Sequence, residues 1–282
     1  MRPWMVGQAD EVLALKTYMQ STFGWKIEDL VLEMYEPSMY VILFDTASTK
    51  FIRDDCSVVE ATTVADKQRV HEELKHFIVT NRIEELDVNE IYSHYAITVI
   101  CKSAFAQCTS LTTIDIPPSI TTIGVDAFLG CTSLTTVVIP SSVSAIGAYA
   151  FYNCRSLTTV VIPDSVTTIG ACSFDDCTSL TTVVIPSSVT TIGAYAFYNC
   201  TSLTTVVIPD SVTDIEERAF QGCASLTTMV IPYSTTTIGP SAFVGCTSLT
   251  TISIPDSVIA IGTNAFQGRA TTTRTPTVRR SC

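Results

Sequence analysis

The stretch CTSLTTVVIPSSVTTIGAYAFYN, residues 177–199, is the cleanest copy of a block of 23 residues that recurs without insertion or deletion over residues 108–268. A fixed period of this length is typical of a solenoid, in which each unit buries its apolar side chains only against its neighbours. We therefore predict seven stacked coils. Their opening cysteines, each at position 1 of its block, are Cys108, Cys131, Cys154, Cys177, Cys200, Cys223 and Cys246.

Apolar side chains stand at fixed positions in every block. A leucine is fourth, an aliphatic residue or methionine seventh and an isoleucine ninth, as in Leu134, Val137 and Ile139. A phenylalanine is at position 21 of all seven blocks, as in Phe151. Proline follows the ninth-position isoleucine each time, and because it has no N–H to donate to a sheet, it should end a strand there. Each coil is thus expected to contain a short strand and a turn.

The pattern L-T-x-V-x-I-P-x-S-V-T-x-I-G-x-x-A-F-x-x-C, from about Ile97 onward, resembles the BspA-like leucine-rich repeat. The resemblance implies a curved repeat solenoid, a mainly β leucine-rich-repeat horseshoe or β-solenoid with short helical turns, used for adhesion or protein recognition. It carries over no catalytic residues. Glu216 stands where the other full blocks have glycine, so we expect that unit to bend its turn differently.

The residues before the repeats have a different composition and suggest a small α+β module over residues 1–82. Residues 10–23 and 64–80 have helical spacing, whereas residues 29–35 and 39–44 read as strands. Residues 269–282, which have no apolar pattern, are expected to be a disordered tail. From Val88 the repeat phase is already readable, and we predict that the solenoid spans residues 83–268 and opens with a degenerate capping repeat. Its apolar positions would be Val88, Ile91, Ile97, Ile100, Ala104 and Phe105.

The charge distribution bears on partners and location. The formal net charge is −11, and residues 108–268 hold ten acids and two bases. An acidic chain without a basic patch argues against nucleic acid as a partner. No apolar run has membrane-spanning length, so membrane insertion is not expected, and residues 1–20 lack the features of a signal peptide. A cytoplasmic location is therefore favoured, while the family resemblance leaves the cell surface open.

The seven block cysteines share one inward position beside the leucine, where free cysteine behaves as a small hydrophobe. We predict a column of buried, reduced thiols, with structural metal or disulfides as the alternative. Cys172 occupies a block position that is outward elsewhere, and we interpret it as a candidate reactive surface thiol.

Residues for catalysis are scarce. The seven blocks contain no histidine and no lysine, so they lack the usual general bases and cationic electrophiles. His71 and His76 resemble a zinc motif, but five residues turn a helix by about 500°, so the two rings diverge. We predict no enzyme and no cofactor. The alternative is that residues 1–82 form a small enzyme or ligand-binding domain, which the solenoid targets to a partner.

Threonine pairs at positions 5 and 6 would form columns of hydroxyls along the sheet. One interpretation is β-propensity with threonine laddering; the other is a recognition face at positions 6 and 8, where side chains project outward. We predict a protein-interaction, scaffolding or adhesion module that binds a protein partner of unknown identity through this face. The residues are Thr136, Val138, Thr159, Val161, Thr182, Val184, Thr205 and Val207.

Two other surfaces stay open. The threonine columns also suit ice or another periodic lattice, although a curved solenoid would work against it. Tyr149, Tyr152, Tyr195 and Tyr198 lie in the turn before the cysteine, either as cover for that turn or as interface anchors. Because the coils are nearly identical, we expect no single differentiated pocket, and an affinity that grows with the number of coils.

Overall fold

The computed structural model of the chain describes residues 97–268, strands outside this range, and a few single residues. The strands are β1 (Leu30–Met34), β2 (Val41–Asp45), β3 (Lys50–Ile52), β4 (Val58–Glu60), β5 (Glu85–Asp87) and β20 (Thr271–Thr275). The single residues are Glu72, Lys75, Ile78, Val79, Arg82 and Tyr92.

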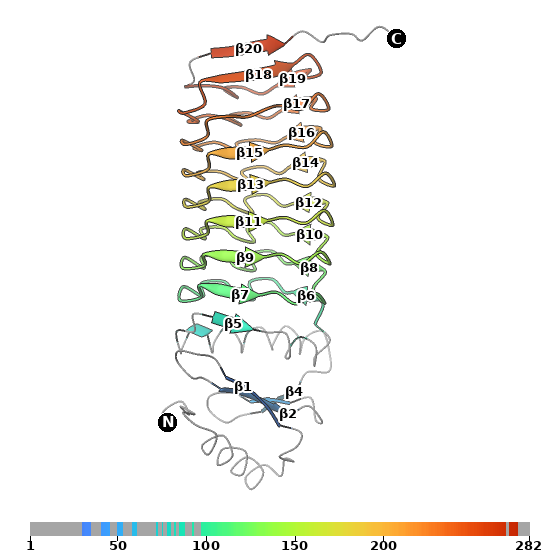
Figure 1. The fold of residues 1–282 in the computed structure, drawn as a ribbon, viewed down its shortest axis with the longest axis vertical. Coiled ribbons are helices and arrows are strands. Elements are labelled where there is room, and N and C mark those ends of the chain that lie inside the picture. The colour runs from blue at the N-terminus through green and yellow to red at the C-terminus, as the bar shows by residue number, and fades with distance from the viewer. Residues whose placement is uncertain are drawn as a thin grey trace.

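The predicted solenoid is confirmed: the coils up to residue 222 contribute one strand to each of two parallel sheets (Figure 1). Residues 223–245 contribute a strand to the second sheet and only isolated bridges, at Thr228 and Val230, on the side of the first. Partners across each sheet stand one block apart, as in Val160 and Val183. The first sheet contains β5, β7 (Thr113–Asp115), β9 (Thr136–Val138), β11 (Thr159–Val161), β13 (Thr182–Val184) and β15 (Thr205–Val207). The second contains β6 (Val99–Ile100), β8 (Thr122–Ile123), β10 (Ala145–Ile146), β12 (Thr168–Ile169), β14 (Thr191–Ile192), β16 (Asp214–Ile215), β17 (Thr237–Ile238) and β19 (Ala260–Ile261).

The third side of each coil is a run of turns, so the predicted helical turns are wrong for residues 97–268. The N–H of Ala150 donates to the carbonyl of Gly147 within the coil, at 3.3 Å, whereas the N–H of Phe151 donates to the carbonyl of Ser173 in the next coil, at 2.8 Å. Because alternate amides bond to the next coil, a helical ladder cannot form. Position 19 has a positive φ in every block, 57° at Tyr149.

In Figure 1 the coils form a nearly straight column, not the curved horseshoe that the resemblance implied. The reason is that all three sides advance by one strand spacing per coil, about 4.8 Å. A helix on one side would be about 10 Å wide and would splay the coils there. Without such helices between residues 97 and 268, nothing widens one side relative to the others.

The core is built from columns of identical side chains. The phenylalanines at position 21, with Phe105 in the cap, stack face to face with ring centroids 5.2 to 5.5 Å apart. No disulfide joins the seven cysteines, all of which the structure describes, and all are fully buried, as predicted. Each thiol from Cys131 to Cys246 also donates to a phenylalanine carbonyl of the preceding coil, at 3.0 to 3.2 Å. The cysteines therefore link coils as well as fill space.

The capping repeat differs from its prediction. Ile97, Ile100, Ala104 and Phe105 are buried as expected. However, the residue of β5 opposite Ile114 is Leu86, 28 residues earlier, and not Ile91. This first coil is thus five residues longer than the others, which the apolar pattern concealed because Ile91 happens to stand 23 residues before Ile114.

The C-terminal end also differs. β20 pairs in parallel with β18 (Thr251–Pro255), so the prediction of a disordered tail is wrong for Thr271–Thr275. The last strand of a solenoid has unpaired backbone groups along its outer edge, and a threonine-rich segment supplies partners for them.

Glu216 does not bend its turn. Its N–H donates to the carbonyl of Ile192 at 3.0 Å, the same bond that Gly170 makes to Ile146. Its carboxylate accepts the N–H of Ala194 at 2.8 Å, so the extra side chain is accommodated along the coil below.

Before the solenoid, β1 to β4 form an antiparallel sheet in that order, and the two predicted strands correspond to β1 and β2. The predicted helix at residues 10–23 lies outside the described residues. Of residues 64–80, only Glu72, Lys75, Ile78 and Val79 are described, and these are helical. The described residues include no helix of the length and apolar character needed to cross a membrane.

Candidate functional site

The eight predicted binding residues all lie on β9, β11, β13 and β15, where the middle residue is buried and the two flanking ones are exposed. We call the surface formed by these flanking residues the strand face. Its valines are 54% to 70% exposed, and Val230 in the following coil, at 74%, continues the column. The outward orientation is therefore as predicted, while a role in binding stays a prediction.

The two threonines of each pair have different roles. At position 5, the hydroxyls of Thr135, Thr158, Thr181, Thr204 and Thr227 each donate to the carbonyl of the equivalent threonine one coil earlier, at 3.1 to 3.3 Å. At position 6, the hydroxyls of the strand face make no hydrogen bond to any described residue. Position 5 thus forms the threonine ladder, and position 6 leaves its hydroxyls available to a ligand.

The four tyrosines lie on the turn side and pack in pairs. Tyr149 and Tyr152 meet edge to face with centroids 5.9 Å apart, and Tyr195 and Tyr198 are tilted at 5.6 Å. Tyr149 is 41% exposed. The tyrosines therefore cover the turn only partly.

Beside these tyrosines, on the turn side of the four coils of residues 108–199, lies a pocket of about 720 Å³, which we call the turn pocket. Its cause is the coil of residues 154–176, which has Cys172 and Asp175 at positions 19 and 22, where the coils on both sides have tyrosine. The expectation that near-identical coils hold no differentiated pocket is therefore wrong. The lining residues are Asp126, Leu129, Tyr149, Tyr152, Ala171, Cys172, Asp175, Ala194 and Tyr195.

Cys172 and Asp175 are each only 8% exposed. Interaction with the Cys172 thiol raises the pKa of the Tyr149 hydroxyl. Burial raises the pKa of this thiol, so it stays protonated at neutral pH, and the interpretation of Cys172 as a reactive surface thiol is wrong. Burial, together with the neighbouring Asp176, raises the pKa of Asp175 to about 7.

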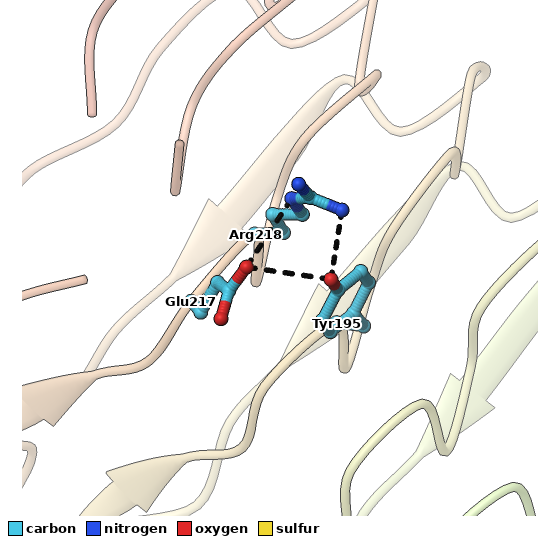
Figure 2. Close-up of polar contacts among 3 residues, drawn as sticks. All are labelled: Tyr195, Glu217 and Arg218. Atoms are coloured by element: carbon cyan, nitrogen blue, oxygen red, sulfur yellow. Dashed lines mark hydrogen bonds and ion pairs between the residues drawn. The ribbon is translucent and has the colours of Figure 1, made fainter. Parts of the chain in front are cut away.

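Cys172, Tyr195 and Arg218 are position 19 of three successive coils, so Tyr195 lies between the other two along the solenoid. The guanidinium carbon of Arg218 lies 5.3 Å from the centre of the Tyr195 ring, and its Nη1 donates to the tyrosine hydroxyl at 2.8 Å. Glu217 completes the group (Figure 2), with Oε1 3.4 Å from both the hydroxyl and the Arg218 Nε. This ring thus already contacts one cation.

Neither the strand face nor the turn pocket contains a histidine or a lysine. Within the part of the chain that the structure describes, no three histidine, cysteine, aspartate or glutamate side chains gather closely enough to hold a metal ion. His71 and His76 lie outside the described residues, as does most of residues 1–82. The alternative that these residues form a small enzyme or ligand-binding domain therefore stays a prediction.

Comparison with known proteins agrees with the fold. A family model described as "BspA type Leucine rich repeat region" matches residues 78–190 and 144–273. A leucine-rich repeat protein from T. pallidum is 36% identical, with a TM-score of 0.51 over 54% of this chain and 72% of that one. A leucine-rich cell surface protein from Faecalibacterium prausnitzii is 30% identical, with a TM-score of 0.47 over 73% of this chain. The match spans 63% of the length of the latter.

No curated protein matches the chain. The expected cytoplasmic location finds no support in these comparisons.

Proposed function

The chain belongs to the BspA-type leucine-rich repeat family, and from this premise we propose that it is a non-enzymatic protein-binding module whose strand face contacts the partner. The observation that carries the proposal is the column of exposed valines over five successive coils, Val138, Val161, Val184, Val207 and Val230. Isolated exposed apolar side chains are ordinary, but a contiguous apolar surface is typical of an interaction site.

The chemistry of the strand face indicates what kind of surface it would contact. From β9 to β15 its outward residues are only threonine and valine, with no charged side chain. Strand spacing places equivalent side chains about 4.8 Å apart. A complementary partner would therefore bury the valine methyl groups and hydrogen-bond to the free hydroxyls at position 6, without needing opposite charge.

Repetition determines how affinity would arise. Each coil presents the same Thr and Val pair, so each contributes a similar and individually weak contact. Once one coil is engaged, the next binds at a high effective concentration, and affinity rises with the number of coils engaged.

The test is affinity capture with the immobilised full chain and three double variants. Thr159→Arg with Thr182→Arg introduces bulk and charge on the strand face. Ser141→Arg with Ser187→Arg introduces the same charge at exposed turn positions and serves as the matched control. Circular dichroism checks that each variant is folded.

We expect the proteins retained by the unaltered chain to be retained by the serine control and lost with the threonine variant. The third variant, Tyr149→Ala with Tyr195→Ala, should weaken capture less. If instead the tyrosine variant loses the captured proteins and the threonine variant keeps them, the turn side is the binding surface and the proposal is wrong.

A second candidate function is binding to a periodic lattice, such as ice. The observation in its favour is the nearly straight column of coils (Figure 1), because curvature was the argument against it. Thermal hysteresis of a solution of the chain would support this function. It should be absent if the strand face is specific for protein.

A further inference from the structure

We propose that the turn pocket is a second binding site, which takes a planar organic cation, the guanidinium group of an arginine side chain, between Tyr149 and Tyr195. Its residues lie on the turn side of the coils and share none with the strand face. The inference therefore stands or falls separately from the proposed function.

The spacing of the coils indicates how much room lies between the two tyrosines. In the core of the same three coils, Phe174 stacks between Phe151 and Phe197 with centroid distances of 5.3 and 5.4 Å. At position 19 the middle coil has Cys172 in place of a ring. Two strand spacings are about 9.6 Å, and a flat group in contact with a ring on each side needs about 7 to 8 Å. One guanidinium layer fits.

In place of the second ring the middle coil has a carboxyl group, and a bound cation would favour its ionised form. Position 22 of the middle coil is Asp175, between Tyr152 and Tyr198 of the flanking coils. Asp175 is more than nine-tenths buried and lines the pocket, whereas Asp126 lines it one coil further away, on the other side of Tyr149. No basic side chain is among the lining residues. A carboxyl group that is removed from water in this way attracts a cation more strongly than an exposed one does.

The structure already contains the proposed contact once. On the coil next to Tyr195, away from the pocket, Arg218 holds its guanidinium carbon 5.3 Å from the centre of that ring (Figure 2). Arg218 occupies the same block position as Cys172. A guanidinium in the pocket would therefore contact Tyr195 from the side of Cys172, opposite Arg218. On that side the chain itself provides no cation.

A guanidinium is favoured over an ammonium group for two reasons. It is flat and stacks on aromatic faces, and its several N–H donors can bond a carboxylate in pairs. A compact ammonium would leave most of the space between the two rings unfilled. The same group could come from a free small molecule or from an arginine within a peptide, and the experiment separates these sources.

The experiment is isothermal titration calorimetry of the full chain with three probes. N-acetyl-arginine amide carries the guanidinium, N-acetyl-citrulline amide is its neutral isostere, and a Gly-Gly-Arg-Gly-Gly peptide embeds the arginine in a chain. We expect the arginine compound to bind at least tenfold more tightly than the citrulline compound. Tighter binding of the peptide identifies a peptide as the source, and equal binding of the two identifies the free cation.

Two variants test the site itself. Changing Cys172→Tyr, Ser173→Ala, Asp175→Tyr and Asp176→Asn gives the middle coil the turn sequence of both flanking coils. Because the chain already folds this turn twice, the variant should fold while its pocket is filled, and binding should be lost. Asp175→Asn retains the shape but removes the charge, and should weaken the arginine compound at least tenfold.

The strand-face variant Thr159→Arg with Thr182→Arg is the control, and should bind the arginine compound as the unaltered chain does. Equal affinity for the arginine and citrulline compounds, undiminished binding by the filled variant, or no binding of any probe would each overturn the proposal. None of these results bears on whether the strand face binds protein.

Discussion

The two threonine columns provide a sharp test, because adjacent residues of one type should respond differently to the same substitution. Four residues at position 5 are changed to valine in one variant and four at position 6 in the other. Valine keeps the shape and β-propensity of threonine and removes the hydroxyl. The first set is Thr135, Thr158, Thr181 and Thr204; the second is Thr136, Thr159, Thr182 and Thr205.

The expected magnitudes follow from the hydrogen bonds. Each position-5 hydroxyl donates to a carbonyl one coil away at 3.1 to 3.2 Å. A net hydrogen bond contributes about 0.5 to 1.5 kcal/mol. The lower end of this range applies, because after the substitution each carbonyl still accepts a hydrogen bond from the backbone N–H of the next coil. The position-5 variant should therefore lose about 2 kcal/mol of unfolding free energy, and the position-6 variant at most about 0.5 kcal/mol.

Guanidinium denaturation of the full chain, followed by circular dichroism, gives the comparison. The position-5 variant should unfold at a lower midpoint, whereas the position-6 variant should unfold close to the unaltered chain and lose captured partners. Equal destabilisation by the two sets would refute the division between ladder and recognition threonines. So would a larger loss from the position-6 set.

Other predictions concern single residues of the turn side. Ser173 has a buried hydroxyl without a partner among the described residues, where the other full blocks have alanine. Ser173→Ala should therefore raise the unfolding free energy by about 1 kcal/mol in denaturant titrations. Glu216→Gly removes the acceptor of the Ala194 N–H, and hydrogen exchange at that amide should accelerate. Burial and the neighbouring carboxylate raise the pKa of Asp175 to about 7 in the folded state. As the pH rises, the unfolded chain therefore loses this proton at a lower pH than the folded chain does. Stability should fall between about pH 4 and 7, and Asp175→Asn should stabilise the chain at pH 8 more than at pH 5. A maleimide should label the repeat cysteines and Cys172 only after denaturation, and rapid labelling of the folded chain would contradict their burial.

Most of the fold could be predicted from the 23-residue repeat period. A strictly kept interval of 23 residues places leucine, cysteine and phenylalanine in columns whatever the details of each coil, so register and core could be predicted from spacing alone. What spacing could not show is backbone pairing. The bond from Phe151 to the next coil, which replaces a helix by turns, accompanies positive φ values at positions 19 and 23 of the block, here Tyr149 and Asn153. Non-glycine residues such as Tyr149 adopt these values here without a sequence signal.

The first coil and the C-terminal strand of the solenoid could not be predicted, for a related reason. Leu86 and Ile91 are both aliphatic, and only the pairing with Ile114 distinguishes them. The last strand, β18, leaves an open edge, so a segment without an apolar pattern can add to it through main-chain bonds. Apolar periodicity reports burial of side chains, and both of these features depend on backbone hydrogen bonds.

The candidate sites show where a repeat protein can hold specific chemistry. Thr136, Val138 and their equivalents could be predicted as outward because they alternate with buried residues, but repetition makes every coil alike. The turn pocket arises the opposite way, from positions where individual coils depart from the tyrosine pattern. Replacing two tyrosines by Cys172 and Asp175 removes two rings from columns that the neighbouring coils continue, and those neighbours become the walls. In a solenoid the deviations from the consensus, more than the consensus itself, therefore indicate where a distinct ligand can bind.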